Sequence, residues 1–192
     1  MKLTSKKNTM FLAICTIFFM GCSDDDSNED QIFDVVSEVV YDGETYGLDK
    51  GYIYLGGENY DNQGEIMDDS FIIEASLVAS GLSYIAHEDW VEFQGSGVFL
   101  SIDFNSSEKS KLADGIYEFA GKLDNRDALT FSGGNFTTDL SALADKDSYD
   151  EITGGTVKVS NEDGVVTLAI NMTTENSTIK GNFSNTTEVI EQ

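Results

Sequence analysis

Apolar and polar residues alternate along most of the chain that follows Phe33. In the segment "GVFLSIDF" the apolar residues recur at every second position, at Val98, Leu100, Ile102 and Phe104. A period of two is that of a half-buried β-strand, in which successive side chains point to opposite faces. The segment "GVVTLAINM" repeats the spacing, at Val166, Leu168, Ile170 and Met172. The pattern therefore predicts strands that each have one buried face.

Eight further segments are short, rich in β-branched and aromatic residues, and bounded by Gly, Asp or Asn, so we expect strands there as well. They cover residues 35–41, 45–48, 51–55, 71–79, 116–120, 129–136, 156–160 and 178–183. Asp42-Gly43 is a type I′ hairpin signal, and a short loop is expected at 161–164. Strands joined in this way are antiparallel neighbours. Helical spacing is confined to one short helix or turn within 137–151.

About ten short strands, each with one apolar face, can bury those faces in two stacked sheets or in one sheet that closes on itself. We predict an all-β fold, an antiparallel β-sandwich formed by residues 34–192 as a single domain. The chain has 192 residues and a hydrophobic content of 40%, which is sufficient for a core of that size.

The charge of the chain limits its partners. Its formal net charge is −24, from 35 acidic and 11 basic residues. Phosphate backbones and anionic lipid headgroups repel such a surface, so we expect neither nucleic acid nor electrostatic membrane binding. The acidic surface mainly provides solubility.

Residues 1–21 have the pattern of a secretory leader. Three lysines precede the apolar run "MFLAICTIFFM", and the small residue Gly21 follows it. The run is shorter than the roughly 20 apolar residues of a transmembrane helix. We therefore expect residues 1–21 to be a signal peptide that is removed, together with Cys15. Its removal would leave 8 of the 11 basic groups against 35 acidic ones.

Cys22 follows the leader directly, in the tetrapeptide "FMGC". It would be the one cysteine of the processed chain, so no intramolecular disulfide can form. The tetrapeptide resembles the lipobox of bacterial lipoproteins, with Phe19 and Met20 where that motif usually has Leu and Ala or Ser. The resemblance implies a lipid, such as palmitate, on Cys22 and a membrane anchor that two or three acyl chains make firm. The alternative is an ordinary signal peptide with an incidental cysteine.

The acidic run after Cys22 predicts a flexible tether over residues 22–33, because like charges repel and extend a chain. Its start, Ser23, Asp24, Asp25 and Asp26, is similar to the export signal of lipoproteins of Bacteroidota. That resemblance implies a lipoprotein on the outer face of the outer membrane. Retention in the periplasm is the alternative.

Two later segments, "LSIDFNSSEKSKLADGIYEF" and "ITGGTVKVSNEDGVVTLAINMTTENSTIKGNFSN", resemble the C-terminal half of small outer-membrane lipoprotein domains of Bacteroidota. The resemblance covers residues 98–185 and consists of a "GxY" strand followed by a "GGTVxV" and "IKGxFS" meander. It implies a β-sandwich at the cell surface. It supplies no catalytic residue.

The sequence contains few residues that indicate catalysis. His87 is the single histidine, the processed chain offers no cysteine nucleophile, and no GxSxG motif occurs. A structural zinc site would need four His or Cys ligands, and the sequence has only one histidine and two cysteines. With 35 acidic residues, some close carboxylate pair of the glycosidase kind arises by chance and indicates nothing. We expect that the protein is not an enzyme.

Calcium is the one metal that the sequence suggests, because it binds clustered carboxylate and carbonyl oxygens. One candidate set comprises Asp61, Asn62, Glu65, Asp68 and Asp69, and a second comprises Asp145, Asp147, Asp150 and Glu151. Neither has the spacing of an EF-hand. The more ordinary interpretation is that acidic loops solubilise the strand connections, and no cofactor besides the lipid is expected.

Aromatic side chains offer another candidate site, because flat rings stack on sugar faces. Tyr52 and Tyr54 share one face of a strand, and Tyr84 precedes the single tryptophan, Trp90. Either set is a candidate ligand platform. The alternative is that these rings complete a core or cover a sheet edge.

Taken together, these features predict a lipid-anchored outer-membrane protein that acts as a non-catalytic binding module for a glycan or another extracellular ligand, or for an outer-membrane protein. A structural or adhesive component of the cell surface is the alternative. A hydrolase would require a deep cleft with a close carboxylate pair.

Overall fold

The computed structural model describes residues 36–61, 63–86, 91–121, 126–142 and 149–191, which belong to one compact unit, Asp34–Gln192. These residues form twelve strands and one 3-10 turn, η1 (Leu140–Ala142). The strands are β1 (Glu38–Tyr41), β2 (Glu44–Gly47), β3 (Lys50–Tyr60), β4 (Ile66–Val78), β5 (Leu82–Ala86), β6 (Val91–Gly95), β7 (Phe99–Ser106), β8 (Gly115–Phe119), β9 (Thr130–Thr137), β10 (Asp150–Glu162), β11 (Val165–Thr174) and β12 (Thr178–Glu191).

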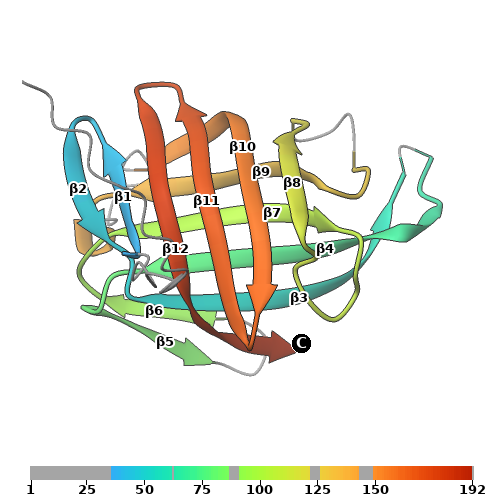
Figure 1. Ribbon diagram of the computed structural model, residues 1–192, viewed down its shortest axis with the longest axis horizontal. Helices are drawn as coiled ribbons and strands as arrows, with labels where there is room; N and C mark the ends of the chain where they lie inside the picture. Colours follow the sequence, from blue (N-terminus) through green and yellow to red (C-terminus); the bar gives the residue numbers. More distant parts are fainter. Residues whose placement is uncertain (1–35, 62, 87–90, 122–125, 143–148, 192) are drawn as a thin grey trace, which may run out of the picture. The chain divides into compact units, whose positions relative to one another are not determined.

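Ten strands form one mixed sheet in the order β11-β10-β8-β9-β7-β4-β3-β12-β1-β2. Because β11 also pairs with β12, the hydrogen-bonded order closes on itself, and the β1–β2 hairpin extends beyond β12. Figure 1 shows the result as two layers whose strands cross: β1, β2, β8, β10, β11 and β12 run one way, and β3, β4, β7 and β9 run behind them. Orthogonal packing of this kind depends on strands that pass from one layer to the other.

Strand β12 is such a strand. Over residues 178–186 it pairs antiparallel with β11, and over 187–191 it pairs in parallel with β3, from Thr187 opposite Gly51 to Glu191 opposite Leu55. The crossing requires glycine at position 51, because a β-carbon there would lie 2.6 Å from Cζ of Phe183 and 2.9 Å from Cγ2 of Thr187. The backbones of β3 and β12 can therefore approach closely at this corner.

The main core lies between the two layers. The alternation predicts its members correctly: Leu100, Ile102 and Phe104 of β7 are buried, as are Leu168 and Met172 of β11. The largest buried rings are Phe104, Tyr117, Phe131, Phe136 and Phe183. The phenol of Tyr117 donates a hydrogen bond of 3.0 Å to the carbonyl of Ala113, which satisfies its buried hydroxyl.

The predicted all-β sandwich is confirmed, with four differences in detail. Several strands are long, up to the fourteen residues of β12. Strands β5 and β6 were not predicted, although "LSYIA" and "VEFQG" are as long as other segments that were. Two neighbouring pairs, β3–β12 and β8–β9, are parallel, although antiparallel neighbours were expected. In the described part of 137–151, only the 3-10 turn η1 is helical.

The predicted type I′ turn between β1 and β2 is present, since Asp42 and Gly43 have φ angles of 50° and 81°. The acidic segment around Asp61 is the tip of the β3–β4 hairpin, and Asp68 and Asp69 lie within β4. Among the described residues, no helix is both long and apolar enough to cross a membrane.

Candidate functional site

A second, smaller apolar cluster lies on the outer face of β3, beneath the β5–β6 hairpin. Even-numbered positions of β3 point away from the main core, so Tyr52 and Tyr54 join Val78 and Leu82 there. Tyr84 of β5 stacks on Tyr52 with ring centroids 5.2 Å apart and an interplanar angle of 24°. This group and the rings of Phe93 and Phe99, which pack against it, are called the outer cluster below.

The structure corrects the prediction that Tyr52, Tyr54 and Tyr84 form an exposed ligand platform. The structure brings Tyr52, Tyr54 and Tyr84 together, but Tyr52 is only 7% exposed and Tyr54 only 6% exposed. The β5–β6 hairpin covers these rings, and its Phe93 packs against Tyr52 in a T-shaped arrangement with ring centroids 5.5 Å apart. The tyrosines therefore attach the hairpin to the sheet, as the alternative interpretation predicts. Trp90 and His87 lie outside the described residues.

Tyr54 of this cluster has a buried hydroxyl group that no described residue satisfies. Among the described residues, its hydroxyl is the one buried side-chain polar atom without a hydrogen-bond partner. Burial, with a smaller effect of Tyr84, raises the pKa of this phenol well above its ordinary value. A buried hydroxyl without a partner costs roughly 1–3 kcal/mol of desolvation. The cluster therefore gains apolar contact at the expense of one unsatisfied polar group.

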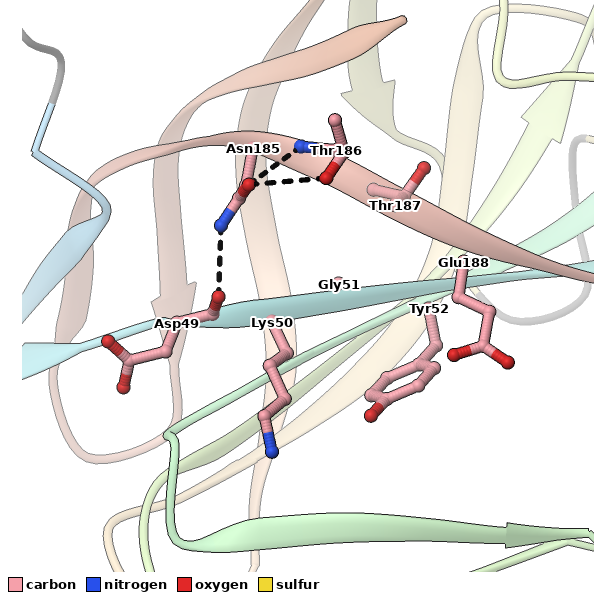
Figure 2. Close-up of a pocket in the computed structure, with 8 residues that line it drawn as sticks. All are labelled: Asp49, Lys50, Gly51, Tyr52, Asn185, Thr186, Thr187 and Glu188. Atoms are coloured by element: carbon pink, nitrogen blue, oxygen red, sulfur yellow. Dashed lines mark hydrogen bonds between the residues drawn. The ribbon is translucent and has the colours of Figure 1, made fainter.

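A groove with a volume of about 340 Å³ lies next to the outer cluster, where β12 crosses onto β3. We call it the β3–β12 groove, and Figure 2 shows the residues that line it. They are Asp49, Lys50, Gly51, Tyr52, Asn185, Thr186, Thr187 and Glu188. The groove therefore combines hydroxyl, amide, ammonium and carboxylate groups with the edge of one aromatic ring.

Hydrogen bonds hold the end of the groove near Asp49. Asn185 Nδ2 donates to the carbonyl of Asp49 at 3.0 Å, and Asn185 Oδ1 accepts from the backbone N–H of Thr186 at 2.8 Å (Figure 2). The carboxylate of Asp49 is itself an acceptor, at 2.7 Å from the backbone N–H of Ser80. These contacts fix the path of β12 relative to β3 at the corner.

Lys50 links the groove to the β5–β6 hairpin. Its ammonium donates to the carbonyl of Leu82 at 2.8 Å and to that of Ser80 at 3.3 Å. Charge-assisted bonds to two carbonyls at the start of β5 hold the hairpin over the outer cluster. Lys50 is therefore a positioning residue for this wall of the groove.

Lys50, Tyr52 and Glu188 extend to the same side of the crossing strands in Figure 2. Tyr52 and Glu188 are register partners in the parallel pairing, which places a phenol beside an exposed carboxylate. Burial raises the pKa of Tyr52 above its ordinary value, and the charge of Glu188 adds to the effect. The phenol consequently stays uncharged at neutral pH.

The structure does not bring the first calcium candidate set together. Asp61 Oδ1 accepts from the backbone N–H groups of Gln63 and Glu65, at 2.8 and 2.9 Å, so it closes the hairpin turn. Asp68 and Asp69 are successive, exposed residues of β4, in the stretch between Met67 and Phe71 where the register with β3 shifts. Asn62 lies outside the described residues. Within the described ranges, no three His, Cys, Asp or Glu residues form a group that could hold a metal ion.

Of the second set, Asp150 lies in β10, where it accepts hydrogen bonds from Tyr41 and Asn176. Burial, followed by the bond to Asp150, raises the pKa of Tyr41 to about 12. Glu151 follows in the same strand, while Asp145 and Asp147 lie outside the described residues. Asp150 therefore has a structural role between the β1, β10 and β12 regions.

Comparison with known proteins found no matching family model, no matching curated protein and no matching solved structure. The assignment of a site therefore rests on geometry. Cys22 and the segment from Ser23 to Asp26 also lie outside the described residues.

Proposed function

We propose that this protein is a non-catalytic binding module of the cell surface and that the β3–β12 groove is its binding site. The observation that carries the proposal is the composition of the groove, in which Lys50, Tyr52 and Glu188 extend to one side of two crossing strands. Binding pockets typically have volumes of about 300–1,000 Å³ and a few polar groups that fix orientation. The volume of about 340 Å³ is at the lower end of that range.

A neutral, hydroxyl-rich ligand such as a glycan segment fits this groove best. Both hydrogen-bond donors and acceptors are present, and the lining carries one ammonium, of Lys50, and two carboxylates, of Asp49 and Glu188. The net charge of −24 disfavours polyanions, which would be repelled on approach. The small volume indicates that one or two sugar units of a longer chain are held at a time.

The arrangement of carboxylates supports binding rather than hydrolysis. Most glycosidases place two carboxyl groups on either side of the scissile bond. Asp49 and Glu188 both line the groove, but the carboxylate of Asp49 accepts a backbone hydrogen bond from Ser80 and lies apart from Glu188 in Figure 2. This geometry supports ligand binding rather than glycoside hydrolysis in the β3–β12 groove.

The proposed location follows from the N-terminal sequence. A lipid on Cys22 would anchor the chain to the outer membrane, and the acidic tether would carry the domain to the exterior. Replacement of Cys22 by Ala should abolish labelling with radioactive palmitate, and label that persists on the variant would refute the lipid anchor. Protease added to intact cells should degrade the wild-type domain, whereas full protection would place it in the periplasm.

Glycan binding is tested by a glycan array with folded protein, followed by calorimetry on the best ligand. Glu188→Ala should weaken binding about tenfold or more, because hydrogen bonds to charged groups contribute about 1.5–3 kcal/mol. Tyr52→Phe retains the ring and removes only the phenol, so it should weaken binding less. Glu175→Ala, at an exposed position in the β11–β12 turn, is the control. Silence of the folded wild-type protein on the array would count against the proposal.

A structural or adhesive role remains the second candidate. It requires an edge that can pair with another chain, and β2 ends the sheet without a further partner among the described residues. That edge is only four residues long, a length typical of edges that are protected from aggregation. The groove therefore gives the binding module the stronger support.

A further inference from the structure

The β3–β4 hairpin extends beyond the strands that flank it. Strand β4 pairs with β7 only from Phe71 to Val78, and β3 pairs with β12 only from Gly51 to Leu55. Beyond Leu55 of β3 and Phe71 of β4, toward the turn, β3 and β4 pair with no other strand in the described part of the chain. Figure 1 shows this end of the hairpin projecting past β7 and β8. We call residues 57–61 and 63–70 the finger.

The finger is held rigidly at both ends. At its tip, Asp61 and Glu65 join through a backbone hydrogen bond of 2.9 Å, and Asp61 Oδ1 accepts two further N–H groups. At its base, the buried Asn59 donates to Asn105 Oδ1 at 2.7 Å and to Ser70 Oγ at 3.2 Å. A preorganised element loses little conformational entropy when it binds, which favours a role in recognition.

An apolar pair is exposed on this finger. Tyr60 and Ile66 are register partners next to the turn, and they are 45% and 52% exposed. A cross-strand pair of an aromatic and a β-branched residue stabilises a hairpin. About half of each side chain nevertheless remains in contact with solvent. The exposed half is available to a partner.

Exposed carboxylates lie along the same finger. They belong to Glu58, Asp61, Glu65, Asp68 and Asp69. Two basic residues are near the base of the finger: Lys109, 3.4 Å from Glu58, and Arg126, which donates to Asn59 Oδ1 at 3.4 Å. A surface that complements the finger therefore combines an apolar recess with positive charge, because like charges that face each other across an interface are unfavourable. Nucleic acid and anionic lipid do not meet this requirement.

We propose that the finger is a docking element that inserts Tyr60 and Ile66 into an apolar recess, bordered by Lys and Arg, on a partner protein. The proposal is independent of ligand binding in the β3–β12 groove, because no finger residue lines that groove. A second copy of this chain is a poor partner, since it carries only 11 basic residues against 35 acidic ones.

The test replaces Tyr60 by the photo-crosslinking residue p-benzoylphenylalanine in the full chain, expressed in its own host cells. The same residue at Thr173, an exposed position of β11, is the control. We expect one dominant adduct to another protein, and mass spectrometry should place the crosslink on an apolar residue of a surface that Lys and Arg side chains of that protein border. No adduct above the Thr173 control, an adduct to a second copy of this chain, or a crosslink on a surface that acidic side chains border would overturn the proposal.

Two variants separate docking from folding. Ile66→Thr keeps the β propensity of the finger and removes the exposed apolar group, so it should reduce the adduct while the circular dichroism spectrum is unchanged. Glu65→Gln combined with Asp68→Asn and Asp69→Asn removes three charges and leaves the turn acceptor Asp61 in place. This variant should lower the adduct yield and its sensitivity to salt, and an unchanged yield in both variants would also overturn the proposal.

Discussion

Tyr52 of β3 and Glu188 of β12 are direct partners in a parallel pairing, although they lie near opposite ends of the domain sequence. Tyr52 belongs to the outer cluster and also lines the β3–β12 groove. Glu188 lines the groove beside it and is exposed to solvent. Packing of the β5–β6 hairpin and the shape of the groove therefore depend on the same corner of the fold. Changes that loosen the corner should affect both.

Gly51→Ala should destabilise the protein by about 1–3 kcal/mol, the usual cost of overpacking. The new β-carbon would lie 2.6 Å from the buried ring of Phe183 and 2.9 Å from Thr187 Cγ2, so β3 and β12 would have to separate. Urea denaturation measures the loss. Gly47→Ala is the matched control, because the closest atom to its added β-carbon is Asp49 Oδ2 at 4.0 Å. Equal stabilities of the two variants would contradict the close approach.

Tyr54→Phe should leave stability unchanged or raise it by about 1 kcal/mol, because it removes a buried hydroxyl that has no partner among the described residues. Tyr117→Phe provides the opposite case. Its hydroxyl donates to the carbonyl of Ala113, so its removal should cost about 0.5–1.5 kcal/mol. Thermal melting of the two variants compares them directly. A clear loss of stability in Tyr54→Phe would show that its hydroxyl is satisfied after all.

The local pattern of the sequence was sufficient to predict ten of the twelve described strands and the main core. The alternation at Leu100, Ile102 and Phe104 identified the buried face of β7, and Asp42-Gly43 identified the first turn. These features depend on residues that are close in sequence. Strand pairing between distant segments leaves no comparable signal, and for this reason the parallel pair β3–β12 was not foreseen. The parallel pair β8–β9 joins consecutive strands and was not foreseen either.

The candidate site was predicted only in part. Tyr52 was identified as a site residue, but its ring was expected to be exposed, whereas the β5–β6 hairpin covers it. The other walls of the groove, Lys50 and the segment from Asn185 to Glu188, were not identified. They carry ordinary polar side chains, and only the crossing of β12 onto β3 brings them together. A groove formed in this way cannot be recognised from residue spacing.

Lys50→Met should loosen the β5–β6 hairpin while the main sheet stays intact. Methionine retains most of the aliphatic stem but cannot donate to the carbonyls of Leu82 and Ser80. Hydrogen exchange should therefore accelerate at the amides of residues 82–86, with little change in β7 or β11, because local opening requires less free energy than global unfolding. Lys158→Met, at an exposed position of β10, is the control. Unchanged exchange in the hairpin would show that the outer cluster alone holds it.

Glu74→Gln should raise stability at neutral pH and reduce its dependence on pH. Glu74 of β4 is the register partner of Asp103, and burial, with a further effect of Asp103, raises the pKa of its carboxyl above the ordinary 4.5. The folded state therefore binds more protons than the unfolded state, so the contribution of Glu74 is most favourable below pH 4.5 and is lost as the pH rises through its folded pKa. Glutamine cannot ionise, and its amide oxygen can still accept the hydrogen bond of Ser76.

The melting temperatures of wild type and variant should diverge as the pH rises from about 4 to 8. Glu175→Gln removes one charge at an exposed position and serves as the control for net charge, so a divergence of equal size in that variant would attribute the effect to overall repulsion instead of to Glu74.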